Sequence, residues 1–423
     1  MMEINSVIII ASVVIFLLIT LVLVIALLVA KKKLLPSGNA TIRINDERDI
    51  EVPVGSTLLN TLQNNGIFLS SACGGGGSCG QCRCRVIEGG GEILPTEKGF
   101  FSRKEQKEHW RLGCQTKVKE DLKIEVPESV FGVKEWECEV ISNANVSTFI
   151  KEFVVRLPEG EAMNFKSGSY AQIKIPKYFL SFKDYDIRDK EGQDRFRPEW
   201  DKFSMWGLTS QNNEETVRAY SMANYPAEGN IITLNVRIAT PPIDRATKTW
   251  KAGIPSGVAS SYIFSLKPGD KVTMSGPYGD FHIHEDSDAE MLYIGGGAGM
   301  APLRAQLLHL FRTVKTGRKV SYWYGARSKS EIFYEEDFRE IERNFSNFRF
   351  IIALSDPRPE DNWKGATGFI HQVIHDQYLK DHDAPEDIEY YMCGPGPMSD
   401  AVNRMLESLG VPREQVNFDD FGV

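Results

Sequence analysis

The sequence is poor in cysteine, has no excess of positive charge, and contains a single long hydrophobic run. Lysine and arginine total 49 against 57 aspartate and glutamate residues, for a formal net charge of −8. Nucleic acid selects basic surfaces, so this balance excludes a nucleic-acid partner. Seven cysteines would leave one unpaired in a full set of disulfides, which argues against a disulfide-based scaffold. The remaining composition, 42% hydrophobic and 25% charged, is that of a globular chain of several domains.

The one long hydrophobic run is Val7–Ala30, in which only Ser12 and Thr20 are polar. At 1.5 Å per residue, a helix of this length crosses a hydrocarbon core of about 30 Å. A cleaved signal peptide would begin with basic residues and end at a small-residue cleavage site, whereas here Glu3 precedes the run and Lys31–Lys33 follow it. The run therefore predicts a membrane anchor. By the positive-inside rule, Lys31–Lys33 and everything after them lie in the cytoplasm.

Cysteine and glycine are concentrated in one stretch, CGGGGSCGQCRC. It contains Cys73, Cys79 and Cys82, and Cys114 follows further along. Four thiolates are the ligand set of a [2Fe-2S] cluster, and glycines let the loop wrap closely around the sulfurs. A zinc site usually has two C-x2-C pairs, and only Cys79 and Cys82 have that spacing among these ligands. The pattern predicts an iron–sulfur cluster, with Cys84 as a packed thiol outside the ligand set.

Short alternating segments surround this loop. Ala40–Asn45 and Arg48–Val54 predict a hairpin, Ser56 is placed to cap a short helix, and strands are expected through Val86 and at Leu122–Val126. This order resembles the β-grasp ferredoxins, an α+β fold. The C-x5-C-x2-C spacing is closer to their adrenodoxin-like branch than to the plant branch.

Regularly spaced β-rich segments predict a small antiparallel barrel after this domain. They are Glu135–Ser142, Ile150–Leu157, Tyr170–Ile175, Ile231–Ile238 and Lys271–Ser275. The stretch 177–215 between them is long, charged and rich in aromatic residues. It reads either as a solvated insertion with its own small core or as a docking surface for partner subunits.

Three short motifs lie in the barrel region, and they are Arg218-Ala219-Tyr220-Ser221, Gly257-Val258-Ala259-Ser260 and Gly276-Pro277-Tyr278-Gly279. Their order and separation resemble the ferredoxin–NADP reductase family of FAD proteins. The resemblance implies that Arg218 pairs with the FAD pyrophosphate, Tyr220 stacks on the isoalloxazine, and Ser221 acts near flavin N5. It also implies that Gly257, Val258, Ala259 and Ser260 open a helix toward the pyrophosphate. The alternative is that Tyr220 is a core aromatic and Arg218 a surface cation.

The last third of the sequence has a strand, a glycine turn and a helical pattern, beginning with Met291–Gly295 and GGGAGMAP. Such a turn sets a dinucleotide pyrophosphate on helix amides. Further strands at Val320–Tyr324, Arg349–Ala353 and Glu389–Cys393 alternate with helices and predict a Rossmann-like parallel sheet. Pro302 stands where the usual motif has its last glycine, which matches the reductase family.

The same resemblance implies a nicotinamide site. Cys393 would lie beside the nicotinamide C4 and form the catalytic pair with Ser221; the alternative is a small buried residue at a helix start. Phe421 would cover the flavin until nicotinamide displaces it. The residues expected to bind NADH are Gly295, Gly296, Gly297, Gly299, Met300, Pro302, Cys393, Gly394, Pro395 and Met398.

The residues alone leave the choice of nucleotide open. An acidic residue favours the free ribose of NADH and a cation favours the 2′-phosphate of NADPH. After the strand Val320–Tyr324 the chain offers both kinds, which are Arg327, Lys329, Glu331, Glu335 and Glu336. The family resemblance favours NADH.

These features combine into a multidomain electron-transfer chain. The expected divisions are an anchor and linker at 1–36, a [2Fe-2S] ferredoxin domain at 37–130, an FAD barrel at 131–285, and an NADH domain at 286–423. NADH delivers hydride, a cluster takes one electron at a time, and only a flavin converts between the two. The expected order is therefore NADH, FAD, cluster and external acceptor.

An anchor followed by these three modules resembles the Na+-translocating NADH:quinone oxidoreductases of bacteria. The resemblance implies an electron-input component in the inner membrane, single-pass, with its catalytic domains on the cytoplasmic side. Its partners would be the other membrane subunits of the complex, and quinone would be reached through them. Two alternatives stay open, an anchored oxygenase reductase and a non-enzymatic electron-carrier or docking protein.

Overall fold

The computed structural model describes residues 11–26, 38–244, 247 and 249–419. The chain forms two compact units, one of Met1–Leu69 with Gly75–Phe131 and one of Ser70–Gly74 with Gly132–Val423. Residues 11–26 are helical, and their side chains are exposed. Within the described residues, no helix has both the length and the apolar character that a membrane crossing requires. The predicted anchor, Val7–Ala30, extends beyond these residues at both ends.

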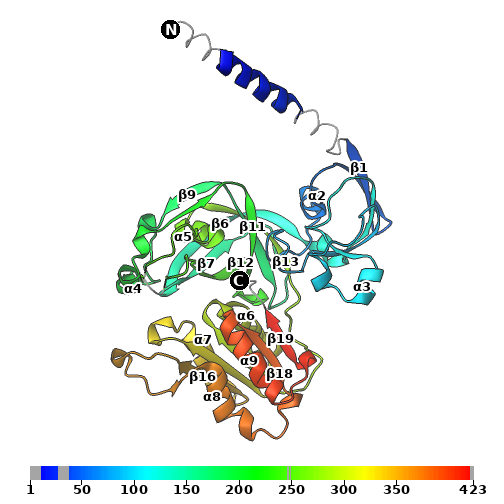
Figure 1. The fold of residues 1–423 in the computed structure, drawn as a ribbon. Coiled ribbons are helices and arrows are strands. Elements are labelled where there is room, and N and C mark those ends of the chain that lie inside the picture. The colour runs from blue at the N-terminus through cyan, green and yellow to red at the C-terminus, as the bar shows by residue number, and fades with distance from the viewer. Residues whose placement is uncertain (1–10, 27–37, 245–246, 248, 420–423) are drawn as a thin grey trace, which may run out of the picture. The chain divides into compact units, whose positions relative to one another are not determined.

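The first unit is built on a five-stranded sheet in the order β2-β1-β5-β3-β4. Figure 1 labels β1 Asn39–Ile44, α2 Leu58–Asn64 and α3 Arg103–Lys107 in this unit. The predicted hairpin is confirmed, because β1 pairs antiparallel with β2 and its turn places Asn45 and Asp46 at positive φ. β5 runs parallel to β1 and antiparallel to β3, which makes the mixed sheet expected of a β-grasp domain. The strands are β1 Asn39–Ile44, β2 Arg48–Pro53, β3 Arg83–Glu88, β4 Trp110–Leu112 and β5 Leu122–Glu125.

The helix predicted after the hairpin is α2, Leu58–Asn64, but its cap is Thr57 and not Ser56. The Thr57 hydroxyl accepts a hydrogen bond from the Asn60 N–H at 3.3 Å. Ser56 lies in the bend that precedes the helix, where its carbonyl accepts from the Val118 N–H. A second short helix, α3 Arg103–Lys107, is closed by a capping box between Ser102 and Glu105.

The second unit begins with an antiparallel six-stranded sheet in the order β11-β8-β13-β6-β7-β12. An antiparallel bridge between Met222 and Leu234 joins its two edges, so the sheet closes into the predicted barrel. The helix α5, Val258–Ser265, packs against it. The strands are β6 Lys134–Ser147, β7 Ile150–Arg156, β8 Tyr170–Ile175, β11 Thr216–Ser221, β12 Ile231–Arg237 and β13 Lys271–Tyr278.

The insertion 177–215 contains a two-stranded antiparallel sheet of β9 Tyr178–Ser181 and β10 Thr209–Asn212, together with the helix α4 Arg197–Lys202. Its aromatic residues Phe182, Tyr185 and Trp200 are buried in the same hydrophobic core as the barrel strands. The insertion therefore extends the core of the barrel, and most of its aromatic character is explained by packing. Phe179, 68% exposed, is the exception among its large apolar side chains.

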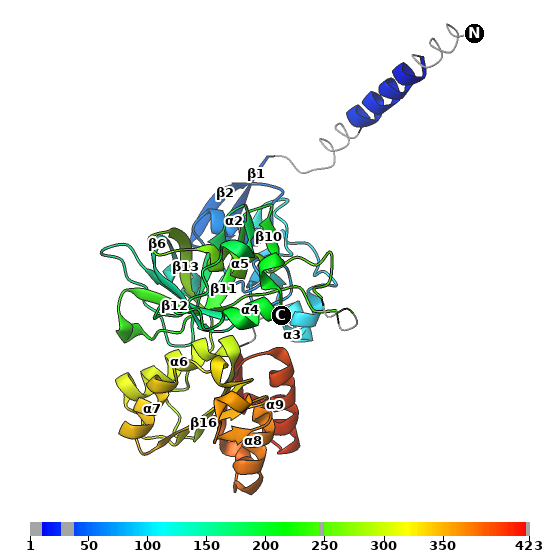
Figure 2. The ribbon, with the colours of Figure 1, turned by 90° about the vertical axis from the view of Figure 1, so that its left-hand side faces the viewer.

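The second unit ends with a parallel six-stranded sheet in the order β17-β16-β15-β14-β18-β19. Alternate residues of β14 face opposite cores: Tyr293 packs with the helices α6 and α7, and Ile294 packs with α8 and α9. Figure 2 shows these helix pairs on the two sides of the sheet. The strands are β14 Met291–Gly296, β15 Val320–Ala326, β16 Phe348–Leu354, β17 Ala366–Thr367, β18 Glu389–Cys393 and β19 Val416–Asp419. The helices are α6 Met300–Leu308, α7 Glu335–Asn344, α8 Ile370–Gln377 and α9 Gly396–Ser408.

Candidate functional site

Two of the four predicted cluster ligands lie side by side in the first unit. Cys82 and Cys114 are buried, and the Cys114 N–H donates a hydrogen bond to the Cys82 Sγ at 3.4 Å. Cys73 and Cys79 are partly exposed. Gly77 has a φ of +78°, and a Cβ there would lie 2.5 Å from the amide nitrogen of Gln115. The Gln115 side chain could move aside, so it is the positive φ that favours glycine at this position.

The chemistry of these thiols fits an iron–sulfur cluster. The side-chain hydrogen bond with the Cys114 thiol, together with burial, raises the pKa of Cys82, and the backbone N–H of Cys114 only partly opposes this. Two such buried thiols ionise only when a cation compensates their charge, and iron ions do this in a cluster held by four cysteines. Within the described part of the chain, no three His, Cys, Asp or Glu side chains form a ligand group for a single metal ion. Cys84 has no exposed area and lies in the hydrophobic core, as expected for a packed thiol.

The predicted flavin-binding residues lie at two places on the barrel. β11 carries Arg218, Tyr220 and Ser221, of which Tyr220 is half-buried and Ser221 is buried. One guanidinium nitrogen of Arg218 donates to the Thr216 hydroxyl at 2.9 Å and to the Val217 carbonyl at 2.8 Å, which fixes the side chain along the strand. Burial raises the pKa of Tyr220, so its phenol stays protonated at neutral pH.

The other place is the start of α5, where Gly257 is the N-cap and Val258 and Ala259 begin the first turn, as predicted for that motif. The Ala239 N–H donates to the Ser260 hydroxyl at 3.0 Å. Among the described residues, the buried Ser256 hydroxyl has no hydrogen-bond partner. An orphaned hydroxyl beside helix amides suits a bound phosphate oxygen, so these residues fit the pyrophosphate of FAD.

The predicted glycine turn leads from β14 through a 3₁₀ turn, Gly297–Gly299, into α6. A Cβ on Gly299 would lie 2.0 Å from the carbonyl oxygen of Cys393, the last residue of β18. A Cβ on Gly296 would lie 2.9 Å from the sulfur of Met398. The turn and the Cys393 segment are thus in close contact between β14 and β18, where the strand order reverses and ligands of open α/β sheets bind.

A cavity of about 540 Å³ opens at this edge of the sheet. Its lining includes Gly296, Gly297, Pro395 and Met398 from the predicted NADH set. Sequence reasoning missed other lining residues because no motif marks them; these are Phe149, Arg237, Ser355, Phe369 and His371. The remaining residues of the predicted NADH set do not line the cavity; they are Gly295, Gly299, Met300, Pro302, Cys393 and Gly394. Of these, Met300 and Pro302 are buried within α6.

The two residues predicted to be catalytic are linked by a third that the sequence did not reveal. The Ser221 hydroxyl donates a hydrogen bond to the Asp419 Oδ2 at 2.6 Å. Asp419 is the last residue of β19 and stands opposite Cys393 in the parallel pairing with β18. The only sequence signal for Asp419 is its place two residues before Phe421, which lies outside the described residues. The ends of a barrel strand and a nucleotide-sheet strand therefore meet at one carboxylate.

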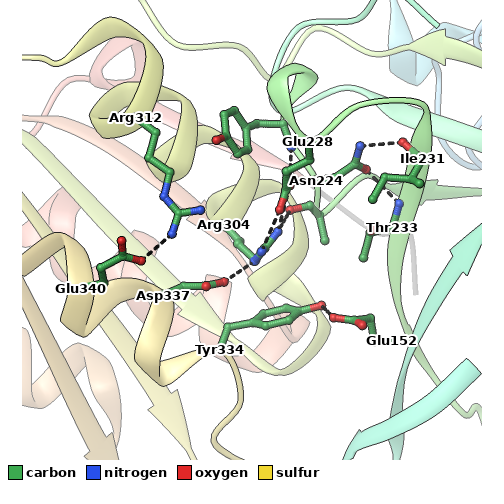
Figure 3. A network of polar contacts seen from close by, with 12 residues as sticks. Glu152, Asn224, Glu228, Ile231, Thr233, Arg304, Arg312, Tyr334, Asp337 and Glu340 are labelled. Atoms are coloured by element: carbon green, nitrogen blue, oxygen red, sulfur yellow. Dashed lines mark hydrogen bonds and ion pairs between the residues drawn. The ribbon is translucent and has the colours of Figure 1, made fainter. Parts of the chain in front are cut away.

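A second polar network joins the barrel to the nucleotide sheet (Figure 3). The Arg304 guanidinium pairs with Glu228 at 3.1 Å and with Asp337 at 2.7 Å, and it donates to the Ala223 carbonyl at 2.8 Å. The ring of Tyr334 lies under it, with the centroid 4.6 Å from the guanidinium carbon. These contacts connect the 3₁₀ turn Pro226–Glu228 of the barrel with α6 and α7 and hold the two parts of the site together.

Three family profiles match the chain in the order of its modules. A 2Fe-2S iron-sulfur cluster binding domain matches residues 42–119, an oxidoreductase FAD-binding domain matches 202–283, and an oxidoreductase NAD-binding domain matches 293–404. These three domain families confirm the cofactor set expected from the sequence, which is a [2Fe-2S] cluster, FAD and NADH.

Solved structures with similar folds include the cytochrome P450 reductase GcoB of Amycolatopsis, with a TM-score of 0.62 and 22% identity over 90% of this chain and 98% of that one. A ferredoxin reductase in carbazole 1,9a-dioxygenase has a TM-score of 0.57 and 24% identity over 91% and 98%. At these identities they support the fold alone.

Curated relatives match along almost the whole chain. The F subunit of the Na(+)-translocating NADH-quinone reductase of Pseudomonas aeruginosa (strain UCBPP-PA14) is 54% identical over 393 residues, 93% of each chain. The corresponding protein of Idiomarina loihiensis, which has the same name, is 55% identical over 395 residues, 93% of this chain and 94% of that one. The chain therefore belongs to the F-subunit family of Na+-translocating NADH-quinone reductases.

Proposed function

We propose that this protein takes electrons from NADH and feeds them into a Na+-pumping NADH:quinone reductase. When bound, FAD converts the two-electron hydride of NADH into single electrons that a [2Fe-2S] cluster accepts. The observation that carries the proposal is the contact between Ser221 and Asp419, because Asp419 is paired with Cys393 on the nucleotide side. Ser221 belongs to the barrel, so donor and acceptor sites share one junction within the second unit.

Each residue at this junction has a defined task. Arg218 and the α5 amides of Gly257–Ser260 hold the FAD pyrophosphate, and Tyr220 packs against the isoalloxazine. Ser221, held by Asp419, positions its hydroxyl at the flavin edge and excludes water there. Cys393 limits how close the nicotinamide can approach, and Phe421 covers the flavin in the absence of nucleotide.

Four cysteines would hold the [2Fe-2S] cluster, which supplies one-electron acceptance. Cys73, Cys79, Cys82 and Cys114 hold the cluster, and their glycine-rich loop supplies backbone N–H groups to its sulfurs. The run Val7–Ala30 anchors the chain once in the bacterial inner membrane, with the domains on the cytoplasmic side. The other membrane subunits of the complex accept the electrons and pass them to quinone. Tethering keeps the cluster at high effective concentration beside that acceptor.

The anchor contributes no residue to the motifs, so residues 37–423 should oxidise NADH with an artificial one-electron acceptor. Membranes of a strain that lacks this subunit should regain NADH-driven quinone reduction only when the full-length protein is supplied. A fragment that holds FAD and cluster yet fails to oxidise NADH would contradict the proposed division of roles. Restoration of an oxygenase in place of quinone reduction would point to the reductase of a hydroxylase.

A further inference from the structure

One carboxylate of the insertion pairs with two arginines of the nucleotide sheet. Glu199 lies on α4, and its Oε1 accepts a hydrogen bond from Arg358 Nη2 at 2.7 Å. Its Oε2 lies 3.6 Å from Arg327 Nη2. The Glu199 side chain is 12% exposed, against 42% for Arg327 and 31% for Arg358. This largely buried carboxylate thus faces two accessible guanidinium groups, and its Oε1 also lies 3.6 Å from the Nζ of Lys202, on the same helix, whose side chain is 65% exposed.

The two arginines stand at the ligand-binding edge of the sheet. Arg327 directly follows β15, and Arg358 follows the neighbouring parallel strand β16. Arg327 also lines the 540 Å³ cavity together with Gly297 of the glycine turn and Ser355. In dinucleotide-binding sheets, an arginine at this place accommodates the 2′-phosphate of NADPH. The positions of Arg327 and Arg358, taken without their neighbours, would therefore predict a site that binds NADPH.

Glu331 lines the same cavity as Arg327, but among the described residues no ion pair joins the acidic residues after β15 to Arg327 or Arg358. Glu331 accepts hydrogen bonds from the hydroxyls of Ser147 at 3.0 Å and Thr148 at 2.5 Å, so its oxygens are directed at the barrel. Glu335 and Glu336 lie on α7 and pair with arginines of the same helix. Asp361, which follows β16, also interacts electrostatically with Arg358, but the carboxylate that pairs with both Arg327 and Arg358 comes from the insertion.

We propose that Glu199 is a specificity-determining residue that makes this site prefer NADH over NADPH. Its charge offsets the two guanidinium groups and repels an entering phosphate dianion at short range. It leaves NADH binding unaffected, because NADH carries no phosphate at this position. The inference deepens the proposed function, since it assigns the insertion 177–215 a role in nucleotide choice.

The test uses the full-length, FAD-loaded protein with Glu199→Gln and, as a second replacement, Glu199→Met. Flavin reduction by NADH and by NADPH is followed by stopped-flow absorbance. Both variants should raise the NADPH/NADH ratio of kcat/KM at least tenfold, mainly through a lower KM for NADPH. The gain should shrink at high salt and disappear when Arg327 and Arg358 are also changed to Ala. Glu335→Gln, which removes a carboxylate that pairs only within α7, should leave the ratio unchanged.

Calorimetric binding of adenosine 2′,5′-bisphosphate and of 5′-AMP separates this inference from the proposed function. Glu199→Gln should tighten the bisphosphate at least fivefold and leave 5′-AMP unchanged, whether or not hydride transfer occurs. An unchanged ratio and unchanged bisphosphate affinity in a variant that keeps its FAD would overturn the inference. Loss of FAD in both variants would also overturn it, because Glu199 would then be a structural ion-pair residue. Failure of the wild-type protein to oxidise NADH would instead overturn the proposed function.

Discussion

The hydroxyl of Ser221 donates a hydrogen bond to the carboxylate of Asp419 at 2.6 Å, which connects the end of a barrel strand to the end of the nucleotide sheet. A hydroxyl fixed in this way is positioned before substrate arrives. Ser221→Ala should therefore slow flavin reduction by NADH at least about tenfold while FAD stays bound. Stopped-flow absorbance under anaerobic conditions measures the rate. Ser275→Ala, a buried barrel serine that bonds Tyr278, is the control, and equal rates in both variants would refute the assignment.

Gly299 is required by the close approach of the glycine turn to β18. In Gly299→Ala the new Cβ would lie 2.0 Å from the backbone oxygen of Cys393, so one of the two segments must move. The Kd for NAD+, which uses the same turn as NADH, should rise at least about tenfold, since the phosphate-binding turn loses its geometry. Gly317→Ala is the matched control, because its Cβ would meet nothing within 4 Å. Titration of both variants with NAD+ measures the effect, and similar affinities would contradict it.

Arg304 and Arg312 offer a comparison of buried and exposed ion pairs (Figure 3). Arg304 is 10% exposed and pairs with two carboxylates, whereas Arg312 is 32% exposed and pairs with Glu340 alone. Arg304→Ala leaves two partly buried carboxylates, 23% and 27% exposed, without their cation and should lower the free energy of unfolding by about 2–3 kcal/mol, less than the loss of a fully buried pair. Arg312→Ala should cost less than about 1 kcal/mol. Urea unfolding, followed by tryptophan fluorescence, measures the free energy of unfolding of both variants. Equal losses of stability in the two variants would mean that the Arg304 network is not buried in solution.

Lys151 is a buried cation whose ammonium donates to the carbonyls of Asn143 and Asp186 at 2.9 and 2.7 Å. Burial lowers the pKa of Lys151 from 10.5 to about 8. Between these two values the folded protein has lost the proton while the unfolded chain retains it, so the Lys151 contribution to stability increases as pH rises. Its full size is about 3 kcal/mol.

Lys151→Met removes this contribution. The unfolding free energy of wild type, relative to that of the variant, should therefore increase from pH 8 to pH 10.5. Urea midpoints at several pH values measure it. Curves that stay parallel across this range would show that the amine is not desolvated.

Much of the fold followed from the sequence because strong local patterns dictate it. Apolar strands such as Met291–Gly295, the glycine turn after it and the cysteine loop identified all three modules and the family. The helix cap moved from Ser56 to Thr57, since adjacent hydroxyl residues are equally good caps and only the backbone decides between them. β19 has a weak apolar pattern at a sheet edge, so the strand carrying Asp419 was not predicted.

The candidate site was predictable where a motif marks it and not where distant segments meet. Arg218, Tyr220 and Gly297 were predicted from short motifs, and their roles stay predictions. The pairing of Glu199 with Arg327 joins residues far apart in the chain, and no local pattern indicates it. The aromatic residues of the insertion suggested a docking surface or a separate core, whereas Trp200 and Phe182 belong to the barrel core itself.

The central claim is that electrons pass from NADH to FAD and then to a cluster held by Cys73, Cys79, Cys82 and Cys114. The most direct test is anaerobic reduction of full-length wild type and Cys79→Ala with NADH, followed by absorbance and EPR. Wild type should show a bleached flavin band and the EPR signal of a reduced [2Fe-2S] cluster. Cys79→Ala should lose the cluster signal and reduce its flavin at the wild-type rate. Loss of flavin reduction in a variant that keeps its FAD, or an unchanged cluster signal, would contradict the account.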